Sequence, residues 1–295
     1  MNGILYIAAT PIGNLEDITF RAVRVLQEAD FIIAEDTRTT MKLLERYNIY
    51  KKIVSCHKFN EKARLNLILN ELLSGKNAVL VSDAGTPCIS DPGHILVLQA
   101  VADGIPVIPI PGPSAVSAGL SVSGFELKNF AFYGFLPRDA SGIKKLLESV
   151  KKDSQNVAVF YESPKRIIKT LEIISITFPN AELCLCNDLS KKFERIYRGD
   201  IDSVIGELRD NPDCEKGEYT LIMQKNRING ESAEPDADIS DISIEAMLFD
   251  KIIKNNCTMK DAVGILYSEK KGLLKKNDIY AASLKLSSSI SQLGP

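Results

Sequence analysis

Four short apolar segments, each followed by a loop of glycine, proline and polar residues, constrain this chain more than any other feature. The clearest is Ala78–Gly93, in which the apolar run Ala78–Val81 leads into a loop containing Gly85, Pro87 and Asp91. Similar corners occur at Ile4–Asn14, Phe31–Arg38 and Val107–Ala115. Apolar runs bounded by turn residues are typical of buried strands. Open α/β sheets bind ligands at the carboxyl ends of such strands, so the four corners predict a substrate cleft.

Strand and helix patterns alternate as far as residue 224, which favours an α/β fold. Helical spacing of apolar residues is clear at Thr19–Glu28 and Glu61–Ser74. This alternation predicts a mainly parallel sheet covered on both faces, with strands at Ile4–Ala9, Phe31–Glu35, Lys52–Cys56, Ala78–Val81 and Val107–Ile110.

A second series of strand patterns follows the Ser121–Lys128 connection. The last three patterns are closely spaced, which predicts a mixed or antiparallel sheet with strands at Phe130–Gly134, Asn156–Tyr161, Ala181–Cys186, Arg195–Gly199 and Tyr219–Gln224. We therefore predict an N-terminal α/β domain over residues 1–120, a second α/β domain over 121–225, a polar linker over 226–240 and a small helical domain over 241–295.

The composition is that of a cytoplasmic protein. The chain has 295 residues, 45% of them hydrophobic, and its formal net charge is −2. No apolar stretch approaches the roughly 18 residues that span a bilayer, and the N-terminal residues carry no basic signal-peptide region. The six cysteines lack the paired spacing of a zinc site and are interpreted as reduced thiols. The near-neutral charge carries no overall signature of nucleic-acid binding, so an RNA site would have to be a local basic patch.

Eight ordered sequence blocks resemble the tetrapyrrole-methylase-like class of S-adenosylmethionine-dependent methyltransferases. Within that class they are similar to the branch that methylates ribosomal RNA of the small subunit. The blocks cover nearly all of residues 3–224: Thr10–Leu15, Asp17–Thr19, Ala34–Arg38, Ser82–Gly93, Pro111–Ala115, Phe132–Arg138, Phe160–Arg166 and Lys216–Glu218.

The resemblance implies a bilobal fold in which S-adenosylmethionine lies in the cleft between two α/β domains. The residues implied for cofactor binding are those of the strand-end loops and of the blocks that close over the donor: Pro11, Gly13, Asn14, Ser82, Asp83, Ala84, Gly85, Asp91, Pro92, Gly93, Pro113, Ser114, Ala115, Tyr161, Gly217 and Glu218. Taken singly, each glycine or proline is explained equally well by a tight turn after a strand.

Three residues are candidates for the chemistry. A ribose hydroxyl is a weak nucleophile, so a proton acceptor would assist its attack, and Asp36 and Glu162 are the candidates for that role. Arg38 is the candidate for holding a phosphate or a carboxylate partner. The alternative for Asp36 is that it caps the helix that begins near Thr37.

Candidate RNA contacts lie in two basic groups and one isolated residue. Lys165 and Arg166 follow the glutamate–serine–proline turn, and Lys191 follows an apolar strand. A further cluster near the C-terminus contains Lys270, Lys271, Lys275 and Lys276. Each basic group is also explained by a solvated helix face.

The chain departs from the class pattern at two positions. Phe59 stands where relatives often carry a histidine, which weakens a two-histidine site involving His57. Asn187 stands where relatives tend to carry arginine, which removes a cation from a possible RNA or interdomain contact.

The resemblance therefore implies a homodimeric, metal-independent enzyme that methylates the ribose 2′-hydroxyl of a decoding-region cytidine in 16S rRNA, with the 30S subunit as its partner and no association with a membrane. Two other functions stay open. One is methylation of a small tetrapyrrole, which would not use the basic turn or the C-terminal helices. The other is a catalytically silent ribosome-assembly factor that binds RNA.

Overall fold

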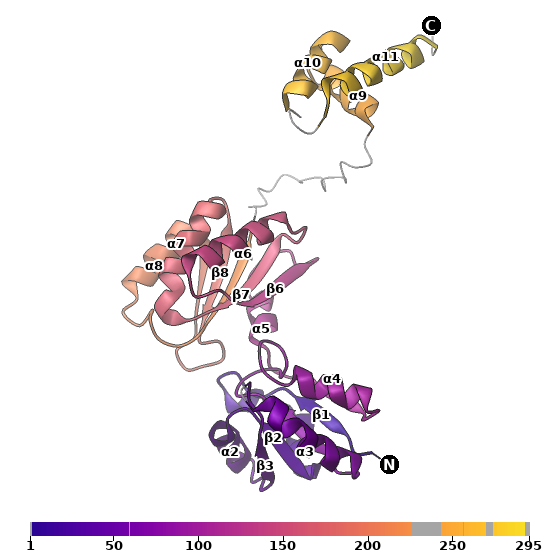
Figure 1. Ribbon diagram of the computed structural model, residues 1–295. Coiled ribbons are helices and arrows are strands. Elements are labelled where there is room, and N and C mark those ends of the chain that lie inside the picture. The colour runs from indigo at the N-terminus through magenta and orange to yellow at the C-terminus, as the bar shows by residue number, and fades with distance from the viewer. Residues whose placement is uncertain (1, 59, 226–242, 256, 270–273, 293–295) are drawn as a thin grey trace. The chain divides into compact units, whose positions relative to one another are not determined.

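The computed structural model describes residues 2–58, 60–225, 243–255, 257–269 and 274–292 of the chain. These residues belong to two compact units, Met1–Arg227 and Ile228–Pro295 (Figure 1). The predicted linker over residues 226–240, Phe59 and the lysines at positions 270 and 271 lie outside the described residues.

The first sheet of the larger unit is parallel throughout. Its five strands lie in the order β3-β2-β4-β1-β5. They are β1 (Leu5–Ala8), β2 (Phe31–Ala34), β3 (Lys52–Ser55), β4 (Ala78–Val81) and β5 (Val107–Ile110). All five predicted strands and their parallel pairing are confirmed. Because parallel strands run the same way, the loops after β1, β2, β4 and β5 meet at one edge of the sheet.

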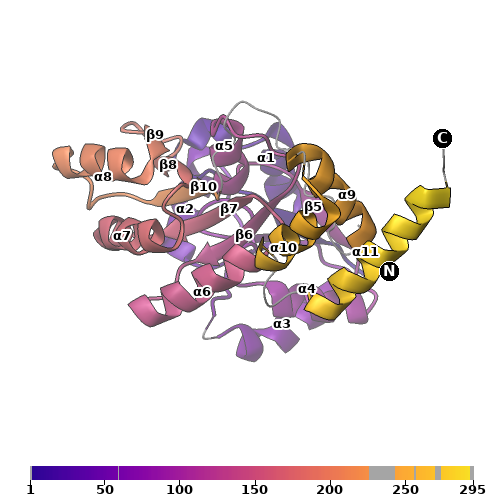
Figure 2. The ribbon, with the colours of Figure 1, turned by 90° about the horizontal axis from the view of Figure 1, so that it is seen from above.

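Helices cover both faces of this parallel sheet. On one face α3 (Glu61–Leu73) and α4 (His94–Ala102) lie side by side and bury Leu72 and Leu96 against the strands (Figure 2). On the other face α1 (Phe20–Glu28) and α2 (Thr37–Arg46) bury Leu26 and Leu44. Two-sided burial explains why β2 and β4 are apolar at every position.

The second sheet is mixed, as the spacing of its strand patterns predicted. Its order is β6-β7-β10-β8-β9, with only β6 and β7 parallel. The strands are β6 (Phe130–Phe135), β7 (Val157–Glu162), β8 (Glu182–Asn187), β9 (Arg195–Asp200) and β10 (Tyr219–Gln224). One face packs against α6 (Ala140–Lys152), α7 (Ile167–Thr177) and α8 (Ile201–Asp210), and Figure 2 shows α6 beside α7.

A single short helix joins the two sheets. Helix α5 (Ala115–Ser121) begins after β5 of the first sheet, but its buried residues Val116 and Leu120 pack against the free face of the second sheet. A domain boundary between residues 120 and 121 therefore falls within a helix that belongs by packing to the second sheet. Both sheets lie in the same compact unit.

The described residues of the smaller unit form three helices with a core of their own. Helices α9 (Ile244–Asn255), α10 (Met259–Glu269) and α11 (Lys276–Gln292) bury Leu248, Leu266 and Ile279 together. The prediction that the C-terminal segment is helical is confirmed for its described residues. Among the described residues of both units, no helix is both long and apolar enough to cross a bilayer.

Because each unit buries its own apolar residues, the larger one should fold without the smaller one. A chain that ends at Arg227 should give the native circular-dichroism spectrum expected for two α/β sheets and melt in a cooperative transition. The matched measurement is the melting of the full chain followed at the same wavelength. A truncated chain without a cooperative transition would contradict this prediction and would show that the C-terminal helices complete the core.

Candidate functional site

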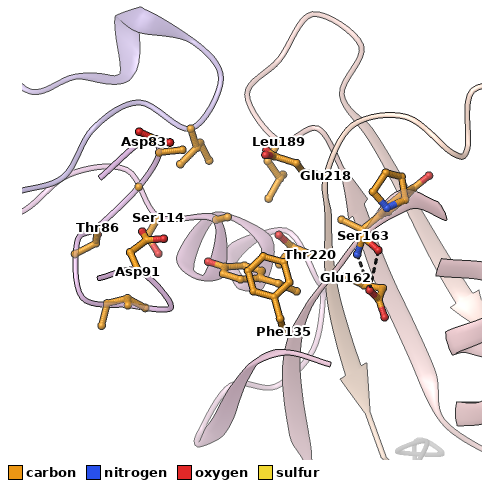
Figure 3. A pocket seen from close by; sticks show the side chains of 18 of the residues that line it. Asp83, Thr86, Asp91, Ser114, Phe135, Glu162, Ser163, Leu189, Glu218 and Thr220 are labelled. Atoms are coloured by element: carbon orange, nitrogen blue, oxygen red, sulfur yellow. Dashed lines mark hydrogen bonds between the residues drawn. The ribbon is translucent and has the colours of Figure 1, made fainter. Parts of the chain in front are cut away.

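The main pocket described in the larger unit has a volume of about 410 Å³ and is lined by residues from both sheets. Figure 3 shows Asp83, Thr86, Asp91 and Ser114 on one side, and Phe135, Leu189, Glu218 and Thr220 on the other. The volume falls in the range of about 300–1,000 Å³ that is usual for pockets that bind small molecules. The pocket lies where the carboxyl ends of the parallel strands were predicted to form a cleft.

Carboxylates from two loops dominate the first-sheet side of the pocket. Glu35 directly follows β2, whereas Asp83 and Asp91 belong to the loop after β4. The Asp83 carboxylate accepts a hydrogen bond of 3.0 Å from the backbone N–H of Asp36, which ties the two loops together. Ser114 begins α5, and its hydroxyl makes no capping bond, so it remains available to a ligand in the pocket.

The crowding of these carboxylates changes their titration. Burial, followed by repulsion from Asp91, Asp83 and Asp36, raises the pKa of Glu35 to about 6. Burial is also the main cause that raises the pKa values of Asp83 and Asp91. The raised pKa of Glu35 is close to the value that suits a proton acceptor at neutral pH.

Aromatic rings form the opposite wall. Phe135 at the end of β6 and Tyr161 on β7 line the pocket, and their ring centroids are 5.3 Å apart. Phe132 packs edge-on against the same tyrosine at 5.0 Å. Phe135 nevertheless remains 63% exposed, so a large apolar ring faces the mouth of the pocket. The pocket thus has an acidic floor, formed by Glu35, Asp83 and Asp91, and an apolar wall.

The charge of the lining selects the kind of ligand. Among the described residues, the lining contains five carboxylates, Glu35, Asp83, Asp91, Glu162 and Glu218, and neither lysine nor arginine. Glu162 is paired with Arg166 and Glu218 with Lys191, so Glu35, Asp83 and Asp91 carry the negative charge that is not neutralised by a neighbouring cation. A cavity lined by such negative charges favours a cationic ligand and repels phosphate. The described residues contain no group of three or more His, Cys, Asp or Glu side chains that could hold a metal ion.

Comparison with known proteins agrees with this geometry. The model of the tetrapyrrole (corrin/porphyrin) methylases matches residues 4–205. The chain belongs to the tetrapyrrole methylase family. Two similar relatives are both named ribosomal RNA small subunit methyltransferase I. One, from Halalkalibacterium halodurans, is 44% identical over 79% of each chain, and the other, from Buchnera aphidicola, is 38% identical over 96% of each.

Two solved structures share the fold of this chain. Diphthine synthase superposes with a TM-score of 0.60 at 15% identity, covering 75% of this chain and 90% of its own. A uroporphyrin-III C-methyltransferase from Thermus thermophilus, complexed with S-adenyl homocysteine, superposes with a TM-score of 0.53 at 18% identity. It covers 76% of this chain and 98% of its own. At these identities the likeness establishes the fold alone.

The structure brings half of the predicted cofactor-binding residues of this chain into the main pocket. These are Asp83, Ala84, Gly85, Asp91, Ser114, Ala115, Tyr161 and Glu218. Pro11, Gly13, Asn14 and Ser82 line shallower hollows beside it. Pro92, Gly93, Pro113 and Gly217 line neither the main pocket nor these two hollows.

Two glycines hold the loops of the pocket in place. Gly85 has a φ of +81° and exchanges two backbone hydrogen bonds with Thr10, so the loop after β4 is joined to the loop after β1. At Gly13 an added Cβ would lie 2.4 Å from Cγ of Lys191. Only glycine therefore allows the loop after β8 to pack so closely on the loop after β1.

The pair Asp36 and Arg38 is engaged in local structure. The Asp36 carboxylate caps α2 by accepting a 2.8 Å bond from the backbone N–H of Arg38, and it also binds the Arg38 guanidinium. The hydrogen bond from the Arg38 side chain is the main reason that the pKa of Asp36 is lowered to about 2. The capping interpretation of Asp36 thus describes its contacts, and neither residue lines the main pocket.

Glu162 and Arg166 form a buried pair. The Glu162 side chain is fully buried and accepts hydrogen bonds from Ser163, Arg166 and Thr170. The guanidinium also donates to the backbone carbonyls of Leu136 and Pro137. These contacts fasten the end of β6 to the start of α7, and they leave little of either side chain for a proton or a phosphate.

The remaining predicted RNA contacts are dispersed. Lys165 is exposed beside the pocket residue Pro164, whereas Lys191 is paired with Asp188 and Glu218 at 2.8 and 2.9 Å. Lys275 and Lys276 are exposed in the smaller unit. Asn187, the departure from the class pattern, is buried and donates to the carbonyls of Lys216 and Glu218. The amide therefore makes a local backbone contact.

Sequence reasoning did not assign two functional candidates, Glu35 and Phe135. Both lie within blocks that carry the family resemblance, so their positions were recognisable. Their roles depend on neighbours from other segments, because burial and the carboxylates of Asp91 and Asp83 raise the pKa of Glu35, and the wall at Phe135 needs Tyr161.

The Glu162 contacts predict that Arg166 is structural. Arg166→Ala should lower the free energy of unfolding by about 3–5 kcal/mol, because it leaves a buried carboxylate without its partner. The control is Lys165→Ala, which removes a neighbouring exposed cation and should change stability by less than about 0.5 kcal/mol. Urea titration of both variants measures the difference. Equal stability of the two variants would show that Arg166 does not anchor Glu162.

Proposed function

We propose that this chain transfers a methyl group from S-adenosylmethionine to ribosomal RNA of the small ribosomal subunit. The observation that carries the proposal is the pocket with an acidic floor and an aromatic wall in a chain that is 44% identical to a ribosomal RNA small subunit methyltransferase I. We further propose that the acceptor is the ribose 2′-hydroxyl of a cytidine in the decoding region of 16S rRNA, within the 30S subunit.

The residues of the pocket fit S-adenosylmethionine. Its sulfonium and ammonium groups are cationic and would be stabilised by Glu35, Asp83 and Asp91. Carboxylates also accept hydrogen bonds from ribose hydroxyls, and the Phe135 and Tyr161 rings offer apolar surface to a purine. When bound, the donor supplies an electrophilic methyl group on a positively charged sulfur, which becomes a neutral thioether on transfer.

We assign the proton acceptor to Glu35. Its carboxylate would take the proton of the ribose 2′-hydroxyl, so that the O–H bond and the donor's C–S bond would break as the new C–O bond forms and the electron pair of the C–S bond stays on sulfur. Glu35 suits this role better than Asp36 or Glu162, because they are engaged by Arg38 and Arg166. Its raised pKa gives it a stronger affinity for the proton than an ordinary glutamate.

The proposal also covers the location of the enzyme, its oligomeric state and the role of the smaller unit. We propose that the enzyme acts in the cytoplasm and as a homodimer, for which α4 offers the exposed apolar residues Leu98 and Val101. We also propose that the smaller unit helps to position the ribosomal subunit, with Lys275 and Lys276 exposed at the start of α11.

The acidic floor leads to a prediction about donor binding. Asp91→Asn keeps the shape of the side chain but removes its charge, so it should weaken binding of S-adenosylmethionine by about tenfold to a hundredfold. Asp103→Asn, at an exposed aspartate after α4, is the matched control and should bind the donor like the wild type. Isothermal titration calorimetry measures both. Unchanged affinity in Asp91→Asn would place the donor elsewhere.

The reaction itself is tested with labelled donor and 30S subunits. The wild type should incorporate methyl groups into 16S rRNA, and kcat/KM should fall below pH about 6 as Glu35 becomes protonated. Glu35→Gln should lower kcat about 10²–10⁴-fold and lose this acidic limb. Methylation of a tetrapyrrole in place of the subunit, or RNA binding without methyl transfer, would favour the two alternative functions.

A further inference from the structure

Two open hollows extend from the main pocket along α2. The first, of about 420 Å³, is lined by the loop after β1 and by Lys42 of α2. The second, of about 510 Å³, is lined by the same loop, by Arg46 of α2 and by Lys192 of the loop after β8. We call these two hollows together the basic groove.

The basic groove is continuous with the main pocket. The first hollow shares Ile12, Asp83, Ala84 and Glu218 with the main pocket. It shares Gly13, Leu15 and Lys191 with the second hollow. A polymer with one nucleotide in the pocket could therefore follow the groove without leaving the surface.

Three cations of the groove are bound to no carboxylate among the described residues, although Nζ of Lys192 lies 5.4 Å from the centroid of the Phe193 ring. Lys42, Arg46 and Lys192 make no hydrogen bond or ion pair there, and all three are exposed. Lys42 and Arg46 are four residues apart on α2 and therefore lie on the same face of the helix. By contrast Arg38, Lys191 and Arg166 are each bound to a carboxylate.

The carboxylates of the groove leave a positive excess at its far end. Glu218 is bound by Lys191, and Asp83 belongs to the side next to the main pocket. In the second hollow the carboxylate of Glu16 stands against two cations that are bound to no carboxylate, Arg46 and Lys192. The charge of the surface thus changes from negative in the main pocket to positive along the groove.

We propose that the basic groove binds the phosphate backbone of the substrate RNA next to the nucleotide that enters the main pocket. This inference rests on the proposed function. Phosphates are attracted by Lys42, Arg46 and Lys192 and repelled by the acidic floor, so the backbone lies in the groove while one ribose reaches Glu35. This role replaces the one predicted for Arg166, whose guanidinium is held by Glu162.

The test compares two triple variants that remove equal charge. Lys42→Ala/Arg46→Ala/Lys192→Ala removes the groove cations that are bound to no carboxylate, whereas Lys144→Ala/Lys145→Ala/Lys151→Ala removes exposed lysines from α6. Binding to 30S subunits and methyl transfer are measured between 50 and 200 mM salt. Donor affinity is measured by calorimetry in parallel.

The groove variant should show a shallower dependence of affinity on salt. Three lost contacts with single-stranded phosphates should reduce the slope of log K against log salt by about two. The wild type should then lose about twentyfold more affinity than the groove variant over this fourfold range of salt. The α6 variant should keep the slope of the wild type, and all three proteins should bind the donor equally.

The outcomes separate this inference from the proposed function. A wild type that fails to methylate 30S subunits overturns the proposed function. If the wild type is active and the two triple variants share one salt slope, the groove does not hold RNA. Loss of donor binding in the groove variant would assign these cations to the donor and overturn the inference. Lys192→Glu is a second variant at a single exposed site and should weaken binding to 30S without weakening donor binding.

Discussion

Electrostatic repulsion among carboxylates at the edge of the parallel sheet is the constraint on which the rest of this structure depends. Glu35, Asp83 and Asp91 come from two loops that parallel strands deliver to the same edge. Burial and mutual repulsion raise the free energy of the ionised forms, so the binding of a cation or a proton in the pocket is favoured. The same charges exclude phosphate, and a polyanionic substrate must therefore find its own cations outside the pocket.

The aromatic wall opposite these carboxylates is held in place by contacts that take no part in the proposed reaction. Arg166 fastens the end of β6 to the start of α7 through Glu162, which supports the segments that bear Phe135 and Tyr161. Gly13 lets the loop after β8 pack against the loop after β1, where Ser190 donates to Asp17. Residues that were predicted to act in catalysis or in binding thus hold the two sides of the pocket in position.

The strands were largely predictable because their signal is local. Apolar runs that end in glycine, proline and aspartate need only a few consecutive residues to be recognised, and all ten predicted strands are present. The closeness of the last three strand patterns also correctly indicated a mixed sheet. The division at residue 120 was less predictable, because α5 follows the first sheet in sequence but buries Val116 and Leu120 against the second.

The sequence by itself determined the elements, their order and the loops that meet at the ligand-binding edge, since these follow from local hydrophobicity and from the geometry of parallel strands. Only the tertiary structure decided which polar side chains are available. Arg166 and Lys42 are both cations, the first at the end of one sequence block and the second four residues after another. The first is bound by Glu162, whereas the second has no partner among the described residues. Likewise Glu35 and Asp36 are adjacent in the chain, but burial beside Asp91 raises the pKa of one while Arg38 lowers that of the other. Availability and acidity depend on neighbours brought together from distant segments, and a linear sequence does not specify those neighbours.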